Sequence, residues 1–322
     1  MGSITDIDGI RLGHETDKEN HTGTTVLICD QPMPCGVDVR GGAPGTRETD
    51  VFSPINLVET VDAIVLSGGS AFGLDAASGV MAWLREQDRG MDTGYGKVPL
   101  VPAAVIFDLP VITGDVRPDA DMGYRAAKSA KSDNPPMGNV GAGSGATVGK
   151  LYGMEHAVKS GIGTASVNGA GGVIVGAVAV VNALGDVIDP ETGRVIAGAL
   201  NRERNGFVDA RKVIHDVSFP FMPPGTATVI GVVAVNVSFG KTDMNRIAKM
   251  AHDGLARSVF PSHTMLDGDT IFAVAAGGIA YADVSICGSL ANEAMSRAVI
   301  DAVENAESID GYPAVRDLPV RT

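Results

Sequence analysis

The chain has 322 residues, of which 44% are hydrophobic and 20% charged, so it can bury a sizeable core, and a disordered or fibrous protein is excluded. The 25 Lys and Arg against 38 Asp and Glu give a formal charge of −13, which argues against nucleic acid or an anionic membrane as a partner, since both require a concentrated positive field. The 42 glycines fall in short clusters between apolar runs, a pattern that predicts many tight turns and close backbone approaches.

The sequence contains no obvious membrane span or export signal. Its best candidate for a span, residues 172–181, is shorter than the roughly 18 to 20 apolar residues that a spanning helix needs. Near the N-terminus, Asp6 and Asp8 stand where a signal peptide needs basic residues and then an apolar run. We therefore expect a soluble protein located in the cytoplasm.

The spacing of cysteine and histidine predicts neither disulfides nor a metal centre. Cys29, Cys35 and Cys287 are an odd number and form no Cys-x-x-Cys pair, so we interpret them as structural thiols. None of the six histidines belongs to a His-Glu-x-x-His motif or another metal-spaced pair. We expect no metal and no cofactor.

Apolar runs and helical periodicity predict a mixed α/β fold. Runs rich in Val, Ile and Ala predict strands at residues 24–29, 63–66, 103–107, 172–181, 228–237 and 270–275. Apolar residues at helical spacing predict helices at 71–85, 243–258 and 288–303. One long polar segment, residues 201–225, interrupts this alternation and leads abruptly into the strand at 228. Since unstructured loops of this length are usually functional or mobile, we expect chemistry at that junction.

Two glycine-rich turns are candidate binding elements. Residues 141–150 fail the phosphate-loop pattern because Ser144 stands where it needs Gly and Leu151 where it needs Ser or Thr, which leaves a close-packed turn or a turn that delivers Lys150 into a site. The turn containing Gly69 and Ser70 lacks the second glycine of a hydrolase nucleophile elbow. It opens a helix, or it lines a substrate pocket through its backbone N–H groups.

Asp267 and Asp269 flank a glycine just before a predicted strand. A calcium-binding loop would continue with an oxygen ligand and a glycine, where this chain has Ile271 and Phe272. Two interpretations of these carboxylates stay open: they cap a turn, or they orient a nucleophile.

Five segments carry a pattern known from one family. They are residues 39–50 (Val-Arg-Gly-Gly-Ala-Pro-Gly-Thr-Arg-Glu-Thr-Asp), 68–77 (Gly-Gly-Ser-Ala-Phe-Gly-Leu-Asp-Ala-Ala), 104–108 (Ala-Val-Ile-Phe-Asp), 250–254 (Met-Ala-His-Asp-Gly) and 263–270 (His-Thr-Met-Leu-Asp-Gly-Asp-Thr). Together, and in this order, they closely resemble the L-aminopeptidase/D-esterase (DmpA-type) peptidase family, whose relatives include β-aminopeptidases and nylon-oligomer hydrolases. The resemblance runs from about Ile4 to the C-terminus.

The resemblance implies a self-cleaving hydrolase of the N-terminal-nucleophile type. The expected fold is a four-layer α/β/β/α sandwich of the kind shared with ornithine acetyltransferases, built as one domain of residues 1–322. Members cut themselves before a Ser or Thr that starts a strand, and the matching residue here is Thr228. The cleavage site is then the Ala227–Thr228 bond, which gives an α chain of residues 1–227 and a β chain of residues 228–322.

The resemblance also implies roles for other side chains. Asp267 and Asp269 match a carboxylate pair that holds the ammonium or hydroxyl group of the nucleophile. Lys150 matches an active-site lysine, and Asn182 matches an asparagine that donates to the developing oxyanion. The amino group freed on Thr228, with an ordinary pKa of about 8, is the expected base.

Two residues depart from the family pattern. Phe107 stands where the nylon-hydrolase branch has Tyr, so a phenol hydrogen bond is missing from the expected substrate pocket, to which Gly69 and Ser70 also belong. Ala227 stands where nearby relatives usually have Asn before the nucleophile, which predicts slower cleavage.

The expected function is hydrolysis of small peptides or amides, such as β-peptides or 6-aminohexanoate oligomers, by a homo-oligomer that is commonly a tetramer in the family. Two alternatives stay open at this point: an acyltransferase of the ornithine acetyltransferase type, and an unprocessed, inactive homologue.

Overall fold

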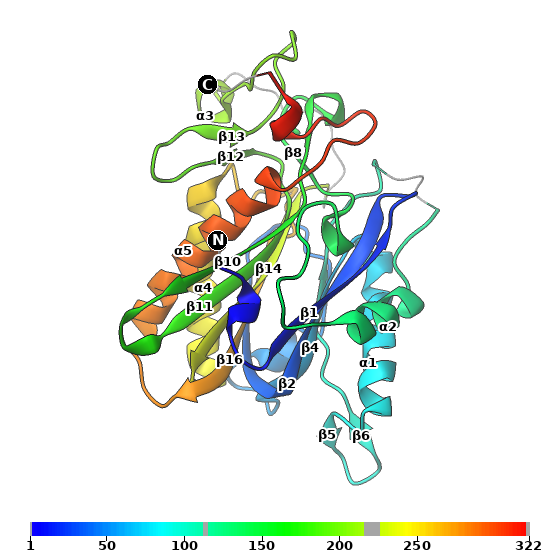
Figure 1. Ribbon diagram of the computed structural model, residues 1–322, viewed down its shortest axis with the longest axis vertical. Helices are drawn as coiled ribbons and strands as arrows, with labels where there is room; N and C mark the ends of the chain where they lie inside the picture. The colour runs from blue at the N-terminus through cyan, green and yellow to red at the C-terminus, as the bar shows by residue number, and fades with distance from the viewer. Residues whose placement is uncertain (1, 112–114, 216–225, 320–322) are drawn as a thin grey trace.

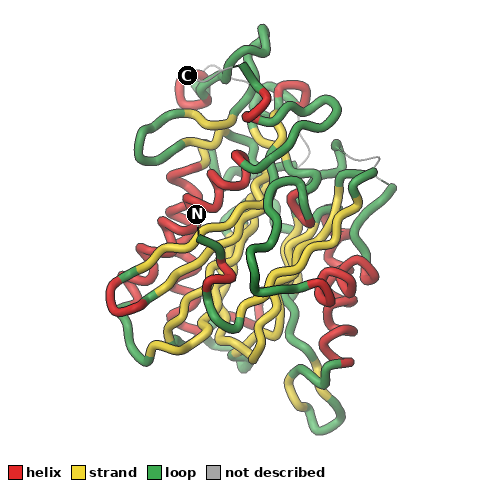
Figure 2. Tube along the Cα trace, viewed as in Figure 1, coloured by secondary structure: helices red, strands yellow, loops and turns green. Residues whose placement is uncertain are grey.

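Two β-sheets pack face to face between two pairs of helices in the computed structural model, which describes residues 2–111, 115–215 and 226–319 (Figures 1 and 2). One helix pair is α1 (Ala76–Glu86) and α2 (Ala120–Ser129). The other is α4 (Lys241–Ser258) and α5 (Val284–Glu304), on the opposite side of the sheets (Figure 1). This arrangement confirms the predicted four-layer α/β/β/α sandwich.

One long strand belongs to both sheets. The N-terminal part of β2 (Thr22–Val39) pairs with β1 (Ile10–Asp17) and β4 (Thr60–Ser67), and the sheet continues to β7 (Ala103–Val105) and β3 (Thr46–Arg47). Its C-terminal part pairs with β16 (Thr270–Ile279), which continues to β14 (Thr228–Val237), β11 (Ile174–Asn182) and β10 (Ile162–Asn168). A register shift between Ile28 and Met33 lets the strand pass from one sheet to the other.

Side chains of β14 alternate between two cores. Val229, Val233 and Val235 pack in the cluster that contains α4 and α5. Ile230 and Val232 pack in the cluster between the two sheets. Because successive strand residues point to opposite faces, Thr228 belongs to the face that looks toward the other sheet.

The outer helices pack through apolar stripes. On α4 the buried residues Met244, Ile247, Ala248, Ala251 and Leu255 recur at helical spacing. A third core cluster places α1 and α2 against Val26 and Ile28 of β2 and Ala63 and Val65 of β4.

Short elements complete the described part of the chain. They are β5 (Met91–Asp92), β6 (Lys97–Val98), β8 (Thr147–Val148), β9 (Val158–Lys159), β12 (Asp186–Ile188), β13 (Val195–Ala197), β15 (Val259–Phe260), α3 (Ala210–Val213) and several 3₁₀ turns. None of the helices in the described residues is long and apolar enough to cross a membrane.

The structure confirms all six predicted strands and three predicted helices, with corrections at their ends. The helix expected at 71–85 begins as a 3₁₀ turn, Ser70–Asp75, and is α-helical only from Ala76. The physical reason is the turn before it, where Gly69 and Ser70 both have positive φ angles of 81° and 54°. Of the predicted loop 201–225, residues 216–225 lie outside the described residues, and the part before them contains α3.

Gly254 lies where α4 packs closely against α5. A Cβ on Gly254 would lie 2.0 Å from the carbonyl oxygen of Asn292 on α5. Helix propensity alone predicts that Gly254→Ala stabilises the protein by about 1 kcal/mol. We expect destabilisation by about 1–3 kcal/mol, because the two helices must separate.

Chemical denaturation measures this effect. The exposed Ala256→Gly change on the same helix reports the propensity contribution alone. A stabilised Gly254→Ala variant would contradict the close approach of α4 and α5.

Candidate functional site

The predicted nucleophile and the predicted oxyanion donor face each other across two paired strands. Asn182, the last residue of β11, is the register partner of Thr228, the first residue of β14. Both side chains are buried, with 1% and 2% of their surface exposed. The antiparallel pairing of β11 and β14 therefore brings these two residues together.

The hydroxyl of Thr228 lies beside the carbonyl group that precedes it. Thr228 Oγ1 donates a hydrogen bond to the carbonyl oxygen of Ala227. The backbone N–H of Gly268 donates to the same oxygen at 3.1 Å and to Thr228 Oγ1 at 3.1 Å. A single N–H group thus faces both the hydroxyl and the carbonyl oxygen of the predicted cleavage site.

The glycine-rich turn places Lys150 against Asn182 and Thr226; its role in a reaction stays a prediction. Lys150 Nζ donates to Asn182 Oδ1 at 2.7 Å, to the carbonyl oxygen of Asn182 at 2.9 Å and to that of Thr226 at 3.2 Å. Gly149, before it, has a φ angle of +74°, and a Cβ there would lie 2.2 Å from the backbone of Gly198. Only glycine fits this turn without strain.

Burial sets the charge state of the lysine. Lys150 has no exposed surface. Loss of hydration lowers its pKa to about 7, although the carboxylates of Asp267 and Asp108 act in the opposite direction. Near neutral pH, Lys150 therefore exists partly as a free amine.

The side-chain amide of Asn182 is fixed at both ends. Its Oδ1 accepts from Lys150 and from the backbone N–H of Thr147 at 3.1 Å. Its Nδ2 donates to the carbonyl oxygen of Phe107 at 3.1 Å. In the uncut chain the predicted oxyanion donor is thus engaged with Phe107, whose side chain is half-buried.

The two aspartates lie next to the nucleophile but have different partners. Asp267 Oδ2 accepts from the backbone N–H and the hydroxyl of Thr264 at 2.7 and 2.6 Å. Burial, followed by the neighbouring Asp269, raises the pKa of Asp267 to about 6. Asp269 Oδ1 accepts from the backbone N–H of Val229 at 2.7 Å, and its Oδ2 accepts from His263. A direct bond from either carboxylate to Thr228 stays a prediction.

The segment that follows β2 holds the Asp-Gly-Asp turn in place. The N–H of Ala43 donates to the carbonyl oxygen of Asp267 at 2.8 Å, and the N–H of Arg40 donates to that of Asp269 at 2.9 Å. A Cβ on Gly41 would lie 2.2 Å from the Asp267 carbonyl oxygen. Residues 39–50 and 263–270, two of the segments that carry the family resemblance, therefore pack against each other.

A buried carboxylate supports the turn at Gly69 and Ser70. Asp108 accepts from the N–H of Gly69 at 2.7 Å and from the hydroxyl of Thr22 at 2.8 Å, and burial raises its pKa. These contacts lie next to Phe107 in the chain. The substrate pocket that we expect at Gly69, Ser70 and Phe107 stays a prediction.

Our sequence reasoning missed several residues of this region. It assigned no role to Asp108, Gly268 or His263, although all three lie inside segments that carried the resemblance.

Within the described residues, no group of three or more His, Cys, Asp and Glu is arranged to hold a metal ion. Cys29, Cys35 and Cys287 are buried free thiols.

Comparison with known proteins gives one family. The model of Peptidase family S58 matches residues 2–315. The chain is 43% identical to an uncharacterized aminopeptidase of Mycobacterium tuberculosis, over 99% of this chain and 98% of that protein. It is 30% identical to a 6-aminohexanoate-oligomer endohydrolase of Paenarthrobacter ureafaciens, over 92% of this chain and 84% of that protein.

Solved structures have the same fold. A Burkholderia sp. beta-aminopeptidase superposes with a TM-score of 0.69 at 21% identity, covering 99% of this chain and 95% of that one. The L-aminopeptidase D-Ala-esterase/amidase of Ochrobactrum anthropi, described as a variant of the Ntn hydrolase fold, superposes with a TM-score of 0.69 at 17% identity, covering 94% and 86%. These comparisons confirm the resemblance found in the sequence.

The buried lysine predicts a pH dependence of stability. The pKa of Lys150 is about 7 in the folded chain against an ordinary value of 10.5, so the unfolded chain binds more protons between these values. The free energy of unfolding must then rise with pH, by up to about 1.4 kcal/mol per pH unit from this lysine. Lys150→Met should reduce that slope between about pH 7.5 and 8.5.

Urea denaturation in a Thr228→Val background, which lacks the hydroxyl predicted to cut the chain, measures the slopes. Lys159, also buried and with its pKa lowered to about 7, supplies the matched variant Lys159→Met. Equal slopes for Lys150→Met and its parent would show that Lys150 keeps an ordinary pKa in the folded chain.

Proposed function

We propose that Thr228 is the nucleophile of this chain, which belongs to peptidase family S58 and is a hydrolase of peptide or amide bonds. Self-cleavage of the Ala227–Thr228 bond would free this nucleophile. One observation carries the proposal. The N–H of Gly268 donates at 3.1 Å both to Thr228 Oγ1 and to the carbonyl oxygen of Ala227. The hydroxyl group and the carbonyl group that it would attack are thus held together by one donor.

Self-cleavage begins with attack of Thr228 Oγ1 on the carbonyl carbon of Ala227. The hydroxyl loses its proton, the carbon–nitrogen bond breaks, and the nitrogen gains a proton, which leaves an ester between the two residues. Water then hydrolyses the ester, which leaves a carboxylate on Ala227 and restores the Thr228 hydroxyl beside the amino group freed in the previous step. During attack, negative charge develops on the Ala227 oxygen, where the Gly268 N–H already donates.

Lys150 is the proposed proton acceptor for this first reaction. The uncut chain has no free amino group at Thr228, so another base is required. With a pKa of about 7, Lys150 is partly unprotonated at neutral pH, and its Nζ contacts the Thr226 carbonyl oxygen at 3.2 Å, two residues before the nucleophile. Its bond to Asn182 Oδ1 also fixes the amide opposite Thr228.

Turnover of substrate uses the amino group that cleavage releases on Thr228, together with nearby N–H donors. The new α-amino group, with an ordinary pKa of about 8, accepts the proton from Thr228 Oγ1. The N–H groups of Gly268 and Asn182 are the proposed donors to the substrate oxyanion. Since Thr228 is 2% exposed and Ala227 fully buried in the uncut chain, separation of these residues also opens access to the nucleophile.

The proposed substrates are small peptides or amides, as expected from the sequence. Support comes from the relatives, which include an uncharacterized aminopeptidase and a 6-aminohexanoate-oligomer endohydrolase. Buried carboxylates at Asp267, Asp269 and Asp108 give the region an acidic character that suits a substrate amine. A cytoplasmic, homo-oligomeric enzyme stays a prediction from the sequence.

Two substitutions at Thr228 test the proposal. Thr228→Val keeps the shape of the side chain without the hydroxyl, and both self-cleavage and hydrolysis of amino-acid p-nitroanilides should fall by on the order of 10⁴-fold or more. Thr228→Ser keeps a hydroxyl and should retain both reactions. Gel electrophoresis measures the cleavage, and p-nitroaniline release measures the hydrolysis.

Hydrolysis by the Thr228→Val variant at the wild-type rate would overturn the assignment. Adding ornithine to the assay separates hydrolysis from acyl transfer, because a transferase would form the acylated amine in place of the free acid. A chain that stays uncut and inactive in every form would favour the inactive-homologue alternative.

A further inference from the structure

His263 combines an unusual backbone conformation with a close contact to the site. Its φ angle is +57°, in the left-handed region that residues with a β-carbon rarely adopt. Its Nδ1 lies 2.7 Å from Asp269 Oδ2, and its backbone N–H donates to the same oxygen at 3.0 Å. The left-handed conformation thus lets one residue bind one carboxylate oxygen through both its backbone and its ring.

The partners of the two nearby histidines define which ring nitrogen carries hydrogen. A carboxylate oxygen accepts, so His263 Nδ1 donates to Asp269. His252 Nε2 lies 2.9 Å from the carbonyl oxygen of Asp38, which also only accepts, so His252 donates through Nε2. The other nitrogens, His263 Nε2 and His252 Nδ1, are buried and have no hydrogen-bond partner among the described residues.

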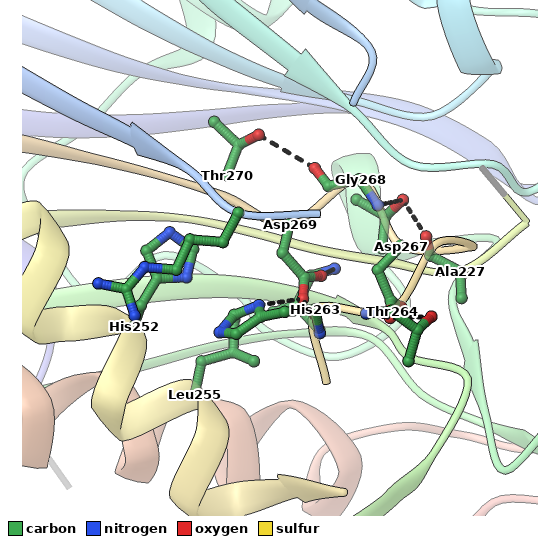
Figure 3. Close-up of polar contacts among 12 residues, drawn as sticks. Ala227, His252, Leu255, His263, Thr264, Asp267, Gly268, Asp269 and Thr270 are labelled. Atoms are coloured by element: carbon green, nitrogen blue, oxygen red, sulfur yellow. Dashed lines mark hydrogen bonds and ion pairs between the residues drawn. The ribbon is translucent and has the colours of Figure 1, made fainter. Parts of the chain in front are cut away.

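His252 packs against the ring of His263 from α4. The two rings meet edge to face with their centroids 4.9 Å apart, and the His252 side chain is fully buried. Burial lowers the pKa of His252 to about 4, so it is neutral at neutral pH. Figure 3 shows His263 beside Asp269, with His252 and Leu255 of α4 close by. The imidazole of His263 is therefore held between the helix and the carboxylate.

Asp269 connects this histidine to the start of β14. One carboxylate oxygen accepts from His263, and the other accepts from the N–H of Val229 at 2.7 Å, the residue directly after Thr228. If Asp269 turned away from His263, the hydrogen bond to Val229 would lose its geometry. The position of the first residues of β14 would then no longer be fixed at this point.

We infer that His263 is a positioning residue, which acts through Asp269 to hold Val229, and with it Thr228, in the orientation needed for attack. This inference rests on the proposed function of Thr228. A left-handed backbone in a residue other than glycine is conformationally unfavourable, and such strain is retained where the surrounding structure imposes it, often at active sites. A histidine that merely filled space between α4 and the turn would require neither the left-handed φ nor the bond to Asp269.

Three variants separate the ring contact from the backbone conformation. His263→Asn tolerates positive φ and can donate from Nδ2 near the position of the histidine Nδ1. His263→Gly relieves the backbone and keeps the backbone N–H donor, but it removes the ring donor. Asp88→Gly relieves a left-handed residue with φ +55° just after α1; it also removes an exposed ion pair with Lys97, and it serves as the control for backbone relief away from the site.

The kinetic measurement follows self-cleavage and then kcat and KM for an amino-acid p-nitroanilide. We expect His263→Gly to slow cleavage and lower kcat by about tenfold to a hundredfold with little change in KM, since a misplacement of about 1 Å can cost about a hundredfold. We expect His263→Asn to recover most of the wild-type rate and Asp88→Gly to equal the wild type. Equal rates for His263→Gly and the wild type, or no recovery in the folded Asn variant, would overturn the inference.

A second readout does not depend on catalysis. In the uncut Thr228→Val background, the backbone amide of Val229 can be followed by NMR and hydrogen exchange. His263→Gly should move the Val229 amide proton upfield and speed its exchange, and His263→Asn should not. An unchanged Val229 amide in His263→Gly would overturn the positioning role, whether or not the wild type cuts itself. If the amide shifts but the wild type stays uncut, the positioning role holds and the proposed function fails.

Discussion

The pairing of β14 with a strand on each side is the constraint on which the site depends. Antiparallel pairing with β11 sets Asn182 opposite Thr228, and parallel pairing with β16 brings the Asp267–Asp269 turn alongside Ala227. A shift of one residue in either register would turn the Thr228 side chain to the helix-covered face of the sheet. Almost complete burial of β14 on both faces prevents such a shift.

Several ionisable side chains are buried in and around the site. Lys150, Lys159, Asp108 and Asp267 are all buried, and burial shifts the pKa of each toward its neutral form. The two lysines are bound mainly by carbonyl oxygens, those of Gly143, Ala146 and Ser160 in the case of Lys159. Such groups destabilise a fold, and perturbed pKa values of this kind are typical of functional sites.

Much of the fold and part of the site follow from the sequence. Apolar runs predicted β14 with its bounds as observed, because a strand buried on both faces is continuously apolar. The family resemblance singled out Thr228, Lys150 and Asn182, which the structure brings together. The continuity of β2 could not be predicted, since Asp30 to Pro34 have the composition of a turn and are tolerated only because the register shifts there.

The missed parts of the site depend on long-range packing. Nothing in the local sequence indicates that His263 adopts a left-handed φ, or that α4 brings His252 within 4.9 Å of its ring. Gly268 acts through a backbone N–H, which any residue type except proline carries, so its role is invisible to a search for reactive side chains. Such contributions become evident only when the segments around residues 40, 228 and 267 are seen together.

Whether Thr228 is freed by self-cleavage can be decided by N-terminal sequencing of the fragments formed on incubating the purified chain. We expect two fragments, the smaller one beginning Thr-Val-Ile-Gly-Val at Thr228. A chain that hydrolyses amides while it remains a single uncut polypeptide, or one that splits at a different bond, would contradict this expectation.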